Sequence, residues 1–170
     1  MSPKSGTVYI KHRKDLPASH SKEESKENKL EEMTKRAGWI IFEISSRPGF
    51  ITPYRNKITI CPNRVTITKR SMFSVEEYPM PIENITNARI YTHFLSASLI
   101  IETFGIPKPE PLNKLKVNDA RLARRYILAL IECRKANIDL FSFDLEELRS
   151  RLKSLGIVQY TTEKKRYHEL

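Results

Sequence analysis

The sequence predicts an α+β domain in which about seven short strands are preceded by one charged helix and followed by two more helices. Two patterns support this prediction: the middle of the chain alternates β-branched and polar residues, and the last third carries apolar residues at helical spacing. Of the 170 residues, 39% are hydrophobic, which is enough for one packed core. No apolar stretch approaches the ~20 residues that span a bilayer.

The first 38 residues are polar and contain two expected segments. Residues 1–20 carry two prolines and several basic residues, which predicts a mobile basic arm. Residues 21–38 are rich in Lys and Glu, which favour helix, and they end on Lys35, Arg36 and Gly38, as helices commonly do. This charged N-terminal helix is therefore expected to lie on the surface.

The next forty or so residues read as strands. Residues 39–44 form an apolar run that stops before Pro48, and residues 57–61 and 64–69 read as a hairpin around Pro62 and Asn63. In that hairpin four residues are expected to face the core, namely Ile58, Ile60, Val65 and Ile67. A further strand is predicted at residues 75–80.

A second hairpin is predicted from residues 86–93 and 97–103. Three prolines between residues 107 and 111 then indicate an extended loop, and residues 115–117 a short closing strand. A helix is expected to begin at Asn118 and to end at Asn137. The last helix is expected from Asp144, with Glu147 as its capping-box acid, to Gly156, and a loose polar tail is expected from residue 161.

The order of these elements resembles the pleckstrin-homology (PH) superfold, and the local sequence is similar to the bacterial PH-like domains. The hairpin at residues 57–69, the segment at residues 80–90, the strand at residues 97–105 and the helix start at residues 118–120 carry this resemblance. It implies an antiparallel sheet sandwich, or partly open barrel, capped by a C-terminal helix. The PH-like domain would span residues 39–138, with residues 139–170 as a C-terminal helix and polar tail.

The resemblance does not extend to the phosphoinositide site of eukaryotic PH domains. Such sites place alternating basic residues across the first hairpin, whereas here Thr68, Lys69 and Arg70 follow one another without that alternation. Many bacterial PH-like proteins also carry neighbouring transmembrane helices, which this sequence lacks.

Catalytic and metal-binding patterns are missing from the sequence. There is no phosphate-binding glycine loop, and the four histidines are far apart, with none at the i, i+4 spacing of a zinc site. Cys61 is interpreted as a packing residue. Cys133 neighbours Arg134, which favours a thiolate, but no histidine lies nearby and a passive thiol is expected. We therefore expect no enzyme activity, no cofactor and no metal.

The basic residues are the candidates for binding an anion or a partner, because the net charge is +10. Arg121, Arg124 and Arg125 share a helix face, and a solvated face is the simpler interpretation. The full set of candidates is Lys57, Arg64, Lys69, Arg70, Arg121, Arg124, Arg125, Lys164, Lys165 and Arg166.

The expected function is a non-catalytic adaptor that docks a protein partner, for example as part of a larger assembly. Two alternatives remain open: association with nucleic acid, or peripheral binding to anionic membrane lipids. A homo-oligomer is also compatible with the sequence. A cytoplasmic location is expected because the N-terminus lacks a signal-peptide pattern and the two cysteines are too few for a disulfide scaffold.

Overall fold

A computed structural model describes residue 34, residues 38–48 and residues 54–168, with side chains described as far as residue 156. The expected arm at residues 1–20 lies outside these residues, as does nearly all of the expected helix at residues 21–38. Contacts divide the chain into residues 1–35 and residues 36–170, and the second unit is the one described below.

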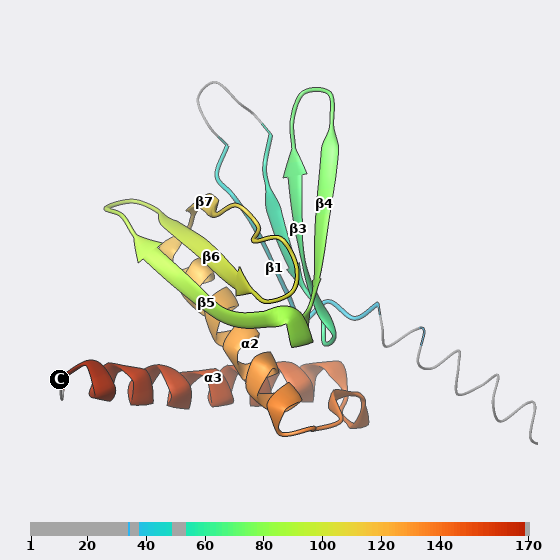
Figure 1. Cartoon of the computed structure of the whole chain (residues 1–170), viewed down its shortest axis with the longest axis vertical. Helices are drawn as coiled ribbons and strands as arrows, with labels where there is room; N and C mark the ends of the chain where they lie inside the picture. Colours follow the sequence, from blue (N-terminus) through green and yellow to red (C-terminus); the bar gives the residue numbers. More distant parts are fainter. Residues whose placement is uncertain (1–33, 35–37, 49–53, 169–170) are drawn as a thin grey trace, which may run out of the picture. The chain divides into compact units, whose positions relative to one another are not determined.

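Seven strands form two antiparallel sheets in the part of the chain that the structure describes (Figure 1). The first sheet contains, in order, β1 (Phe42–Ser45), β2 (Lys57–Ile60), β3 (Arg64–Arg70) and β4 (Val75–Pro81). A 3-10 turn, η1 (Ile82–Asn84), leads into the second sheet. That sheet contains β5 (Ile85–Thr92), β6 (Ala97–Thr103) and β7 (Leu112–Leu115). The α+β class is confirmed, and the sheets form two layers rather than a closed barrel.

The register of the first hairpin places its apolar residues in the core, as predicted. Ile58 pairs with Ile67 and Ile60 pairs with Val65. All four side chains are fully buried. Cys61 and Thr68, which the alternation assigns to the opposite face, are buried as well. The opposite face of the hairpin is therefore covered at Cys61, beside the turn, and at Thr68, near the other end.

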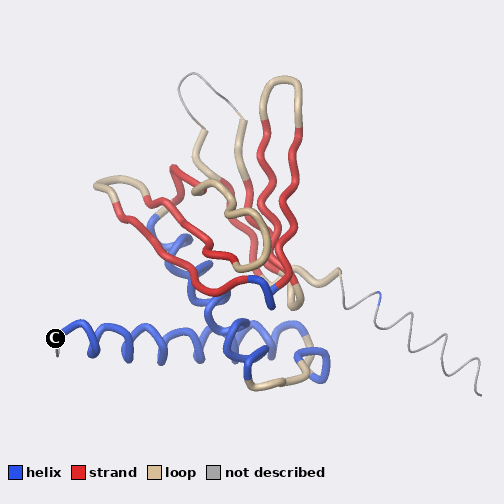
Figure 2. Tube along the Cα trace, viewed as in Figure 1, coloured by secondary structure: helices blue, strands red, loops and turns tan. Residues whose placement is uncertain are grey.

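The helix α2 (Val117–Lys135) covers the sheets and contacts β1, β2, β5, β6 and η1 (Figure 2). Its apolar side is continuous, and the run from Tyr126 to Ile131 is entirely buried. The helix ends as predicted at Asn137, which adopts a left-handed conformation with φ 53°. The amides of Asn137 and Ile138 donate to the carbonyls of Arg134 and Cys133, which closes the helix with a Schellman motif.

The start of α2 was predicted wrongly. The closing strand lies at Leu112–Leu115 instead of residues 115–117, because Leu112 and Leu115 are the two buried side chains that anchor it. The chain turns immediately after Leu115, so the helix begins at Val117. Lys116 precedes the helix without a side-chain cap, and Asn118 lies inside the first turn.

The last helix, α3 (Leu145–His168), begins as predicted but ends later. The carboxylate of Asp144 accepts a hydrogen bond from the amide of Glu147 at 2.8 Å, which confirms the N-terminal cap. Gly156 does not end the helix, and no loose tail begins at residue 161, because α3 continues to His168. None of the described helices is both long and apolar enough to cross a lipid bilayer.

Gly156 has a packing role inside α3. A Cβ atom at this position would lie 2.5 Å from the carbonyl oxygen of Arg125 and 2.9 Å from its Cβ. The two helices therefore cross here with their backbones in close approach, and only glycine leaves enough room. The glycine that looked like a stop signal is the contact point between α2 and α3.

Replacing Gly156 by alanine is expected to destabilise the protein by about 1–3 kcal/mol, because the added methyl group forces the two helices apart. Urea unfolding followed by circular dichroism measures this change. Ser154→Ala is the matched control on the exposed side of α3, and its effect should stay within about 0.5 kcal/mol. A Gly156→Ala protein more stable than the wild type would contradict the close approach, since alanine favours helix where space allows.

Candidate functional site

The basic residues proposed from the sequence do not form one site. Arg64 and Arg70 lie at opposite ends of β3, about 20 Å apart at the rise of a strand. Arg121, Arg124 and Arg125 belong to α2. Lys164, Lys165 and Arg166 lie on the helical backbone of α3, in the part whose side chains are not described. The candidates are thus distributed over three separate regions of the fold.

Two of the candidate lysines are paired with acids. The ammonium group of Lys57 lies 3.1 Å from the carboxylate of Glu43. Lys69 forms an ion pair with Glu110 and also lies over the ring of Tyr78, 5.4 Å from its centre. The hydrogen bond and charge of Lys69 lower the pKa of Glu110, so this carboxylate stays ionised at neutral pH. Both lysines therefore help to hold neighbouring segments together.

Arg124 also makes a structural contact. Its Nε donates to the main-chain carbonyl of Ala88 in β5 at 2.8 Å, and its side chain is partly buried. The backbone of Arg125 forms the contact with Gly156. Arg121, by contrast, is exposed. The three arginines share a helix but differ in their surroundings, so they do not present a uniform anion-binding face.

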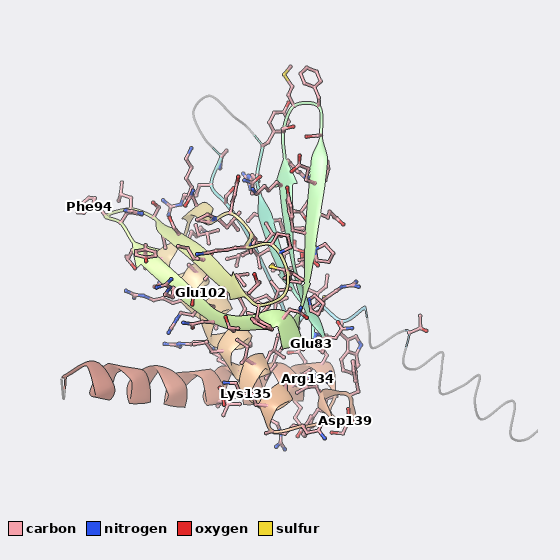
Figure 3. The ribbon with its side chains drawn as sticks, viewed as in Figure 1. Glu83, Phe94, Glu102, Arg134, Lys135 and Asp139 are labelled. Atoms are coloured by element: carbon pink, nitrogen blue, oxygen red, sulfur yellow. The ribbon has the colours of Figure 1, made fainter. Side chains whose placement is uncertain are left out.

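Two hairpin turns expose large apolar side chains. In the β3–β4 turn Met72 is 69% exposed and Phe73 is 92% exposed. In the β5–β6 turn Phe94 is 98% exposed and Leu95 is 70% exposed. We call residues 71–74 and 93–96 the hairpin tips, and Figure 3 shows Phe94 at the end of its hairpin. Turns usually carry polar residues or glycine, so four large apolar side chains here are unusual.

A chain of hydrogen bonds connects the two hairpin tips. Arg47 donates from Nη1 to the carbonyl of Leu95 at 3.0 Å. The neighbouring Ser46 exchanges hydrogen bonds with Asn56, at 2.7 and 2.9 Å. The side chain of Asn56 then accepts from the amide of Arg70 at 3.0 Å. Both hairpin tips therefore lie at the same end of the fold, which we call the loop end.

The loop end is basic. Arg47, Arg55, Arg70 and Lys114 are all exposed there. The main-chain amide of Arg47 donates to the carbonyl of Lys114 at 2.8 Å, which joins the ends of the two sheets. None of the four has an acidic partner within ion-pair distance among the residues that the structure describes. Their charges are available to an anionic surface.

A groove of about 730 Å³ lies at the other end of the fold, beside the C-terminal end of α2. We call it the α2 groove. Its apolar lining comes from the β2–β3 turn, β4, η1, α2 and the segment after α2, and includes Pro62, Pro81, Ile82, Leu130, Ile138 and Phe141. The volume lies within the range of ordinary ligand and peptide pockets.

The polar rim of the α2 groove combines both charges. Arg134 lies 4.0 Å from Glu83, and the side chain of Asp139 accepts from the amide of Phe141 at 3.0 Å. Figure 3 shows Glu83, Arg134 and Asp139 gathered at this end, away from Phe94. Arg64 also lines the groove. The guanidinium groups of Arg64 and Arg134 are the charged donors on this rim, and the carboxylates of Glu83 and Asp139 are its acceptors.

The cysteines do not form a reactive centre. Burial raises the pKa of the Cys61 thiol, although the neighbouring Arg64 guanidinium partly opposes this. Burial also raises the pKa of the Cys133 thiol, and the charge of Glu132 adds to the effect. Cys133 is therefore not activated by Arg134, in agreement with the passive thiol expected from the sequence. Among the described residues no group of three His, Cys, Asp or Glu side chains comes close enough to hold a metal ion.

No protein-family model and no curated protein sequence matches this chain.

A sequence signal for the hairpin tips exists, but it depends on where the apolar residues stand and not only on their type. Met72, Phe73, Phe94 and Leu95 stand at turn positions, and large apolar residues at turns have no strand neighbours to cover them. The α2 groove had no such signal. Its residues come from three stretches of the chain, within 62–64, 79–83 and 130–141, so only the packed fold brings them together.

Arg124→Met is expected to destabilise the protein by about 1–3 kcal/mol, because the carbonyl of Ala88 loses a charged donor in a partly buried place. Arg121→Met is the matched control on an exposed position and should change the free energy of unfolding by less than about 0.5 kcal/mol. Chemical denaturation measures both. Equal changes in the free energy of unfolding for the two variants would show that Arg124 is solvated like Arg121.

At pH 8 both thiols should react with an alkylating reagent at least about tenfold more slowly in the folded protein than in the protein unfolded in urea. A raised pKa leaves less thiolate, and burial excludes the reagent. Peptide mass spectrometry after timed labelling distinguishes Cys61 from Cys133. Rapid labelling of Cys133 in the folded state would contradict the passive-thiol interpretation.

Proposed function

We propose that this chain is a non-catalytic binding module with a PH-like fold, which docks a segment of a protein partner in the α2 groove. The observation that carries the proposal is the groove itself, with its apolar lining and the guanidinium groups of Arg64 and Arg134 on its mixed-charge rim. The PH-like assignment is supported by the order of seven described strands in two sheets followed by α2. The helix α3 is an addition to that plan.

The chemistry of the groove favours a peptide that combines a large apolar side chain with a carboxylate. Ile138 is 47% exposed at the rim and offers an apolar contact. Arg64 and Arg134 offer guanidinium donors, which bind carboxylates in a planar, two-point geometry. Three prolines, Pro62, Pro79 and Pro81, stiffen the walls, so little ordering entropy is lost on binding.

Binding in the groove is favoured over addition of a strand to the neighbouring sheet edge. The edge strand β4 carries Pro79 and Pro81, and neither has an amide hydrogen to donate. A peptide aligned along that part of β4 would lack the regular ladder of main-chain hydrogen bonds. Recognition must then depend on side chains, which is what the α2 groove provides.

Selection from a random peptide library tests this proposal and requires no identified partner. Peptides selected on the full chain should share a large apolar residue close to Asp or Glu. Their affinity, measured by fluorescence anisotropy, should fall by about tenfold or more in Ile138→Glu, because the new carboxylate repels the peptide and removes the apolar contact.

Phe104→Ser is the control for this experiment, because Phe104 is an exposed aromatic outside the groove. It should leave the affinity of every selected peptide unchanged. Selected peptides that bind Ile138→Glu as tightly as the wild type would place the docking surface elsewhere and contradict the proposal.

A further inference from the structure

The hairpin tips present large apolar side chains to solvent. Phe73 and Phe94 are 92% and 98% exposed, so nearly their whole aromatic surface contacts water. Met72 and Leu95 are exposed beside them. Isolated apolar residues are common on protein surfaces, but two aromatic tips at one end form a feature that usually marks an interaction site.

The tips are held in place by the hydrogen bonds at their bases. Within the first tip the amide of Ser71 donates to the carbonyl of Ser74 at 2.9 Å, and within the second the amide of His93 donates to the carbonyl of Ser96 at 2.7 Å. The chain of contacts through Arg47 and Asn56 then connects the two hairpins. The tips are therefore two separate protrusions at the loop end, and Figure 1 shows the β5–β6 hairpin pointing to the left and the β3–β4 hairpin pointing up.

Exposed bases lie beside both tips, and the exposed acids Glu76 and Glu77 follow the first tip in β4. Arg70 directly precedes the first tip in sequence, and Arg47 donates a hydrogen bond to the second. Arg55 and Lys114 lie on segments joined to the same network. The loop end thus combines exposed apolar side chains with exposed bases, and this combination complements a membrane interface that carries anionic headgroups over an apolar interior.

We propose that the loop end binds the surface of an anionic lipid bilayer, with Phe73 and Phe94 inserted among the acyl chains and the bases in contact with the headgroups. The shape favours this occupant, because each tip is a narrow hairpin end rather than a flat face (Figure 2). A soft interface can accept two separate protrusions, whereas a rigid partner would need two matching pockets. This surface is separate from the α2 groove, and neither proposal depends on the other.

Sedimentation with sucrose-loaded vesicles tests the proposal on the full chain. Vesicles of phosphatidylcholine with about one third phosphatidylglycerol should bind the protein, and vesicles of phosphatidylcholine alone should bind it much more weakly. Phe73→Ser and Phe94→Ser should each weaken binding by about tenfold, the loss expected when one aromatic ring no longer inserts. Arg55→Gln and Arg70→Gln should each weaken it by about fivefold.

Phe104→Ser provides a matched control. Phe104 is 78% exposed and follows β6 at the end opposite the second tip. Removing this aromatic ring should leave vesicle binding unchanged. Circular dichroism of each variant establishes that the fold is retained, which is expected because all three phenylalanines lie outside the core.

Fluorescence measures insertion directly. The Phe94→Trp variant places a tryptophan in the second tip. With anionic vesicles its emission should shift to the blue and should be quenched by brominated lipid. Both changes should exceed those of the wild-type protein, whose emission comes from Trp39. Phe104→Trp should show neither change.

Three results would overturn the proposal. The first is no binding to anionic vesicles. The second is binding that the Phe73→Ser, Phe94→Ser double variant retains, since the tips would then have no part in it. The third is a change of oligomeric state in the tip variants by sedimentation velocity, without any vesicle binding, which would assign the tips to a contact between copies of the chain.

Discussion

The packing of α2 against both sheets is the interaction on which the rest of the structure depends. Its continuous apolar side from Tyr126 to Ile131 is buried, and it contacts strands of both sheets. The two sheets meet directly through few contacts, such as the main-chain hydrogen bond from Arg47 to Lys114. The helix therefore supplies much of the apolar surface that each sheet buries. Gly156 extends this arrangement, because it lets α3 approach α2 closely enough to pack.

This arrangement produces two surfaces of different character. Where α2 ends at Asn137, the chain turns and the following segment forms one wall of the α2 groove. At the loop end the hairpin tips extend past the sheets and remain exposed. Under the two proposals, one end would hold a segment of a protein and the other would rest on a membrane. An adaptor needs two such separate contacts, and the position of α2 keeps them apart.

The sequence predicted the sheets well, because β-strand alternation and helix periodicity are local signals that burial reinforces. The core positions of Ile58, Ile60, Val65 and Ile67 and the end of α2 at Asn137 follow from such signals. The errors came from tertiary contacts: Gly156 resembled a helix stop but serves a helix crossing. The basic candidate residues could be identified from the sequence, but the groups that they contact in the fold could not. Glu110 lies far along the chain from Lys69, and Ala88 lies far from Arg124, so only the fold shows that these two bases are occupied.

Amide hydrogen exchange of the full chain, alone and with anionic vesicles, tests most directly the central claim that the two ends act separately. Vesicles should slow exchange at the hairpin tips, residues 71–74 and 93–96, and leave residues 137–141 beside the α2 groove unchanged. Slower exchange at residues 137–141 with no change at the tips would contradict it, because the membrane contact would then lie at the groove end.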